Sequence, residues 1–175
     1  MRRWRSFRLH IPVLFVFVLM RAASTVLSLN DLLFLLRPVC FLIHLLTGSS
    51  PVFIEGEGYL FSDLNIIIGL SCSGYTFWSL CFLVIAFSVM RITKTMVRVA
   101  ILIPIAILLS YLLTIVVNTI RILISIYTQE IGNLILSKQP HFLIHEITGT
   151  LVYILSLLLI FMLISSLLKK TPHLQ

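Results

Sequence analysis

Long apolar runs alternate with short polar segments along this 175-residue chain. Four of the runs approach the length of about 20 residues that a helix needs to cross the hydrocarbon core of a bilayer. They extend over residues 11–29, 74–90, 99–121 and 144–168. Pro104 interrupts the third run, which a membrane-embedded helix tolerates. The pattern predicts an all-α integral membrane protein with about four transmembrane helices.

The first apolar run has two interpretations. A basic start followed by an apolar stretch is also typical of a signal peptide, and Arg-Ala-Ala-Ser at residues 21–24 supplies small residues near a possible cleavage point. We favour an uncleaved transmembrane helix, with a cleaved leader as the alternative.

A further apolar segment, residues 31–47, is nearly long enough to span the bilayer. A crossing there would invert the sidedness of every later charged loop, so we interpret this segment as an outer interfacial or re-entrant helix. Asn30 or Asp31 is expected to cap its start, and Gly48 to end it. Residues 48–70 are rich in glycine and mixed in polarity, which predicts a short surface loop or hairpin entered at Pro51.

Composition excludes a water-soluble domain, because 59% of the residues are hydrophobic and only 11% are charged. A single membrane domain over residues 1–175 is therefore expected. Lys and Arg are retained on the cytoplasmic side of a membrane. With four spans, nine of the 13 basic residues lie in the cytoplasm with both termini, and all six acidic residues lie outside. The net charge of +7 is thus a topology signal and gives no reason to expect nucleic-acid binding.

Three residues with complementary chemistry are expected at the same outer face of the membrane. Cys72 directly precedes the second span, Arg121 closes the third, and His145 opens the fourth. In an acyl-transfer reaction, His145 would take the proton of Cys72, and the thiolate would attack a peptide carbonyl. Arg121 would stabilise the negative charge. Resolution of the acyl-enzyme by water gives hydrolysis and by an amine gives transpeptidation, and the sequence leaves both open.

Other interpretations of these residues compete with catalysis. Membrane cysteines are usually packing residues, as we expect for Cys40 and Cys81, and a disulfide between Cys40 and Cys72 would remove the nucleophile. His141, His145 and Glu146 form only a loose cluster without zinc-protease spacing, so neither a metal nor another cofactor is expected. A non-catalytic assembly or transport subunit is the alternative function, and a membrane acyltransferase with a lipid donor is a third.

Three short motifs carry a resemblance to a known family. They are Ser-Cys-Ser-Gly at 71–74, Asn-x-x-Arg at 118–121 and His-x-x-x-Gly at 145–149. In this order, each at the outward end of a span, they resemble the signature of the exosortase/archaeosortase family. The chain is most similar to the compact exosortase K type, over about residues 31–168.

The resemblance implies a prokaryotic, multi-pass cell-membrane cysteine protease or transpeptidase whose active site faces the extracytoplasmic side. Its partners would be exported, membrane-anchored proteins that carry a C-terminal sorting signal, made of a short motif, a hydrophobic helix and a basic tail. Motif matching makes Cys72 the nucleophile, Arg121 the oxyanion or thiolate stabiliser and His145 the general acid/base. The supporting or substrate-binding residues would be Ser73, Gly74, Asn118 and Gly149.

Overall fold

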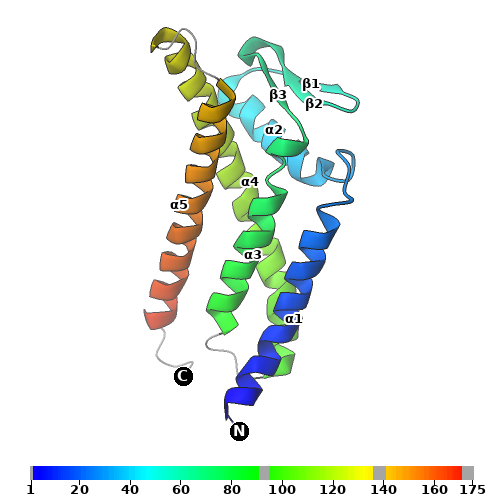
Figure 1. Ribbon diagram of the computed structural model, residues 1–175, viewed down its shortest axis with the longest axis vertical. Coiled ribbons are helices and arrows are strands. Elements are labelled where there is room, and N and C mark those ends of the chain that lie inside the picture. The colour runs from blue at the N-terminus through cyan, green and yellow to red at the C-terminus, as the bar shows by residue number, and fades with distance from the viewer. Residues whose placement is uncertain (1, 91–94, 136–140, 171–175) are drawn as a thin grey trace. The chain divides into compact units, whose positions relative to one another are not determined.

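The computed structural model describes the backbone of residues 2–90, 95–135 and 141–170, and the side chains of these ranges apart from residues 2–8, 129–135, 141–146 and 170. Most of the described backbone is helical (Figure 1). In chain order the main elements are α1 (Arg2–Ala23), α2 (Leu33–Thr47), β1 (Pro51–Ile54), β2 (Gly58–Phe61), β3 (Ile66–Ile68), α3 (Tyr75–Met90), α4 (Met96–Ile135) and α5 (His141–Lys170). Two single-turn 3-10 helices, η1 (Ser62–Leu64) and η2 (Leu70–Cys72), flank β3.

Three helical segments of the described chain are long and apolar enough to cross a membrane. They are Leu70–Met90, Met96–Thr128 and Ile147–Lys169. These segments confirm the coarse prediction of a helical membrane protein and agree with three of the four expected runs.

Two predicted helix limits are wrong. The first helix ends at Ala23 instead of continuing to residue 29, so its apolar part, Leu9–Ala23, is shorter than a full span. The third helix does not close at Arg121 but continues to Ile135. The residues after Arg121 are mostly apolar, and they extend the helix because the cation is held by neighbouring side chains, as described below.

The interfacial segment forms α2, five residues of which are buried: Leu35, Leu36, Val39, Cys40 and Ile43. Gly48 ends the helix as expected, in the left-handed conformation that glycine adopts without strain. The expected cap at its start is wrong. Asp31 instead accepts hydrogen bonds from the backbone and hydroxyl of Ser28, at 2.9 and 2.7 Å.

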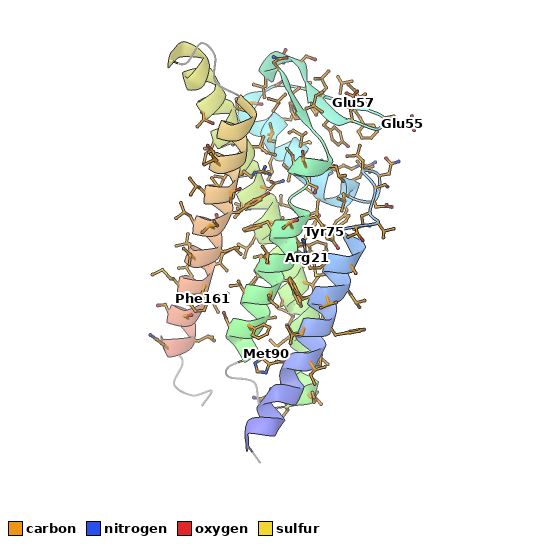
Figure 2. All side chains as sticks on the ribbon, viewed as in Figure 1. Arg21, Glu55, Glu57, Tyr75, Met90 and Phe161 are labelled. Carbon is orange, nitrogen blue, oxygen red and sulfur yellow. The ribbon has the colours of Figure 1, made fainter. Side chains whose placement is uncertain are left out.

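The segment before α3 is an antiparallel sheet with the strand order β1-β2-β3, so the chain is not entirely α-helical. The β1–β2 hairpin was expected, with Pro51 as the first residue of β1. The third strand was not, because Ile66–Ile68 is a run of apolar residues without the alternation that marks a strand. Figure 2 shows Glu55 and Glu57 at the tip of the hairpin, as suits solvated carboxylates.

Contacts divide the chain into two compact units, and the prediction of a single domain stays a prediction. One unit comprises 1–26, 76–114 and 156–175, where the Trp78 indole donates to the carbonyl of Ile107 at 3.2 Å. The other comprises 27–75 and 115–155 and contains α2, the sheet, and one half each of α4 and α5. In this second unit, Ser49 donates to Asp63 at 2.9 Å and fixes the start of the sheet. All the candidate catalytic residues lie in this unit.

Candidate functional site

Cys72 lies in the tight turn that connects β3 to α3. It ends η2, and its side chain is buried, with 8% of its surface exposed. Gly74 follows at a φ of +75°, which lets the chain turn into α3 without the strain that a side chain would add. The Ser73 hydroxyl accepts a hydrogen bond from the backbone of Tyr75 at 3.4 Å and so caps the new helix. Ser73 and Gly74 therefore position Cys72 through the backbone.

Asn118 on α4 connects this turn to two helices. Its side-chain nitrogen donates to the carbonyl of Cys72 at 2.6 Å. Its side-chain oxygen accepts from the hydroxyl of Tyr153 on α5 at 2.6 Å and from Arg121 at 3.4 Å. The residue has no exposed surface. Asn118 thus holds the thiol-bearing turn, the guanidinium and α5 in one hydrogen-bonded network.

Arg121 is buried within this network, with 9% of its surface exposed. One terminal nitrogen donates to the Tyr153 hydroxyl at 3.1 Å, and the guanidinium carbon lies 4.9 Å from the centre of the Tyr153 ring, a cation–π arrangement. The Nε of Arg121 has no hydrogen-bond partner among the described residues. Arg121 is therefore a buried cation with one donor left unpaired by the described residues.

Gly149 on α5 packs directly against this cation. A Cβ atom placed on Gly149 would lie only 2.5 Å from Nε of Arg121, so only glycine lets α5 approach this closely. His145 precedes Gly149 by one helical turn on the same helix face. The His145 side chain lies outside the described residues, as do those of His141 and Glu146, so its role as a base stays a prediction.

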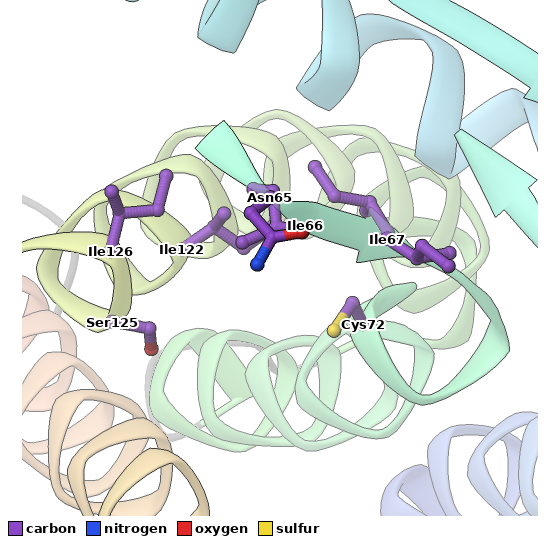
Figure 3. Close-up of a pocket in the computed structure, with 8 residues that line it drawn as sticks. Asn65, Ile66, Ile67, Cys72, Ile122, Ser125 and Ile126 are labelled. Atoms are coloured by element: carbon purple, nitrogen blue, oxygen red, sulfur yellow. The ribbon is translucent and has the colours of Figure 1, made fainter. Parts of the chain in front are cut away.

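Cys72 also faces a cavity of about 210 Å³. Figure 3 shows the Cys72 sulfur turned toward the open centre, with Ser125 of α4 on the opposite side. Ser125 is 3% exposed, and its hydroxyl has no hydrogen-bond partner among the described residues. The remaining lining residues are Asn65, Ile66, Ile67, Ile68, Ile122 and Ile126.

Tyr153 and Ser125 are the two residues of the site that sequence reasoning missed. Tyr153 follows Gly149 by four residues, and Ser125 follows Arg121 by four, so each lies one turn away on the same helix face. That spacing was the available signal. It is weak, because a tyrosine or a serine in an apolar helix is common without any function.

The other two cysteines have the properties of packing residues. Cys40 and Cys81 are buried, and all three cysteines are free, so the alternative of a disulfide between Cys40 and Cys72 is wrong. Burial raises the pKa of the Cys40 thiol to about 12, which keeps it protonated and unreactive near neutral pH.

No protein-family model, curated protein or solved structure matches this chain. The functional argument therefore depends on the geometry of the site. That geometry brings together Cys72, Asn118, Arg121 and Gly149, four residues of the sequence-predicted set, and adds Tyr153.

Replacing Asn118 by alanine should lower the free energy of unfolding by about 1–3 kcal/mol, because the carbonyl of Cys72 and the Tyr153 hydroxyl both lose a buried partner. Denaturant titration in detergent micelles, followed by tryptophan fluorescence, measures the change. Thr119→Ala is the matched control, since the Thr119 hydroxyl donates to Ile115 of its own helix at 2.8 Å. Equal losses in the two variants would contradict the linking role of Asn118.

Proposed function

We propose that this chain is a membrane cysteine protease or transpeptidase, related in mechanism to the exosortase/archaeosortase family that its motifs resemble. One observation carries the proposal. Arg121 is buried, its Nε is unpaired among the described residues, and its network also fixes the backbone of Cys72. Burying a cation is costly, and ionisable residues in apolar helices therefore usually serve a function.

The proposed reaction begins at the Cys72 thiol. His145 accepts the thiol proton, and the sulfur attacks the carbonyl carbon of the scissile peptide bond. The carbonyl electrons move to the oxygen, where Arg121 stabilises the resulting negative charge. Collapse of this intermediate breaks the carbon–nitrogen bond, and the leaving amine takes the proton back from His145. Water or an amine then attacks the thioester and releases Cys72.

The proposed location is a prokaryotic cell membrane, with the site at the outer interface and both termini in the cytoplasm. Three long apolar helices support membrane insertion. We assign the fourth crossing to α1, whose apolar part, Leu9–Ala23, is shorter than a full span and whose basic end would lie near the headgroups. Basic residues in the 91–98 segment and at the C-terminal end of α5 support the orientation.

The proposed substrates are exported proteins anchored by a C-terminal sorting signal. A substrate held by its own membrane helix presents the peptide bond next to that helix at the bilayer surface. This is the depth at which Cys72 would lie, as the third residue of the apolar segment Leu70–Met90. Cleavage there needs no water channel through the bilayer.

The test follows the product and the intermediate. Membrane proteins ending in a short motif, an apolar helix and basic residues are co-expressed with this chain and analysed by intact mass. We expect a C-terminally shortened product and, with the parent chain but not with Cys72→Ala, a substrate adduct that hydroxylamine releases, as a thioester requires. Unchanged substrate masses, with no adduct in either protein, would favour the non-catalytic assembly or transport subunit.

A further inference from the structure

The cavity next to Cys72 has walls suited to one apolar side chain. Five isoleucines line it, three from the β3 strand and two from α4: Ile66, Ile67, Ile68, Ile122 and Ile126. A dry apolar cavity of about 150 Å³ is enough for a benzene-sized group. At about 210 Å³, this cavity has room for a side chain as large as leucine or phenylalanine.

Ser125 and Asn65 add polar groups to this cavity, whose other lining residues are the isoleucines and Cys72. Hydroxyls on α4 usually donate to a carbonyl one turn earlier, as Thr114 does to Ser110 and Thr119 to Ile115. The Ser125 hydroxyl makes no such bond among the described residues, although only 3% of the surface of Ser125 is exposed. A buried hydroxyl without a partner inside a cavity indicates a ligand that supplies one.

We infer that this cavity is the specificity subsite for the substrate residue next to the scissile bond. The inference rests on the proposed function, because the same cavity contains the Cys72 sulfur and its occupant must therefore adjoin the attacked carbonyl. The isoleucines enclose a large apolar side chain of that residue. The Ser125 hydroxyl hydrogen-bonds to a peptide group of the substrate. This bond sets how deeply the substrate residue enters the cavity.

Peptide chloromethyl ketones test the inference without a known substrate. Cys72 displaces chloride from the probe, so that a sulfur–carbon bond forms, the carbon–chlorine bond breaks and the thiol proton leaves to solvent. The protein, reconstituted in nanodiscs, is treated with acetyl-Gly-Leu or acetyl-Gly-Asn chloromethyl ketone, whose side chains are similar in size. We expect the leucine probe to alkylate Cys72 at least tenfold faster, measured by mass spectrometry.

Two variants place the selectivity in this cavity. Ile126→Phe fills it and should bring the leucine-to-asparagine rate ratio close to one, whereas Ile120→Phe, the same change at an exposed position of α4, should leave the ratio unchanged. Ser125→Ala should slow the leucine probe about fivefold. Iodoacetamide, which carries no side chain to bind, should label Cys72 at the parent rate in Ile120→Phe and Ser125→Ala, and its rate in Ile126→Phe corrects the probe rates for any change in access to the sulfur.

The outcomes separate the two proposals. Rapid labelling of Cys72 by iodoacetamide without preference for the leucine probe would overturn the subsite and leave the cysteine nucleophile in place. A preference that survives Ile126→Phe would also overturn it. If iodoacetamide labels Cys72 no faster than Cys40 or Cys81, the proposed function fails, and the subsite fails with it.

Discussion

Replacing Cys72 by alanine should abolish release of the C-terminal peptide from the substrate, with a loss of at least about 10⁴-fold in rate, because removal of a catalytic nucleophile leaves only binding and charge stabilisation. The fold should survive. The backbone carbonyl that Asn118 binds is retained, and the lost sulfur lies beside a cavity. Intact mass of the co-expressed substrate measures the loss, because uncleaved substrate keeps its C-terminal peptide.

Cys40→Ala and Cys81→Ala are the controls for this result. Both side chains are buried packing residues, so each variant should process the substrate at a rate within about twofold of the parent chain if it remains folded. Normal processing by Cys72→Ala would remove the nucleophile assignment. Loss in all three variants would point to folding instead of chemistry.

Gly149→Ala is the second substitution for which we expect a large effect. The added methyl group would meet Nε of Arg121 at 2.5 Å, so either the guanidinium leaves its place against Tyr153 or α5 moves away. Both results withdraw the donor from the developing oxyanion. Removing one such donor costs about 10²–10³ in rate. With the substrate expressed in excess over the enzyme, the rate of substrate cleavage should fall by that factor.

The comparison variants are Arg121→Ala and Leu151→Ala. Arg121→Ala should match the loss in Gly149→Ala, and the double variant should be no worse than either single one, because both changes remove the same interaction. Leu151 is 54% exposed on the same helix, so its replacement should leave the rate unchanged. Full activity in Gly149→Ala would show that Arg121 is not required where the structure places it.

The lengths of the apolar runs predicted most of the helices in this chain. Local geometry determines where those helices begin and end. The limits of α3 were predicted within one residue, because Gly74 and the small polar residues before it mark a start that does not depend on tertiary contacts. The end of α4 was missed because a lone arginine in an apolar helix usually marks the membrane surface. Here Asn118 and Tyr153 accept hydrogen bonds from one terminal nitrogen of the guanidinium, and the helix continues.

The candidate site was predicted in part. Cys72, Asn118, Arg121 and Gly149 were chosen from their order and spacing, and the structure brings them together. Tyr153 was missed because its role depends on which face of α5 meets Arg121, a property of packing that spacing along one helix does not define. The third strand, which lines the cavity, was missed for the same reason, since pairing of Ile66–Ile68 with β2 is a non-local contact.

In the proposed reaction, the extension of α4 past Arg121 would limit how near a folded part of the substrate can come to the Cys72 thiol. The fourteen residues from Ile122 to Ile135 continue the helix for about 21 Å beyond Arg121 at 1.5 Å per residue. An extended chain covers about 3.4 Å per residue. A substrate of the proposed reaction therefore needs a spacer of about six unstructured residues between its last folded element and the bond to be cut, and a shorter tether would hold that bond out of reach.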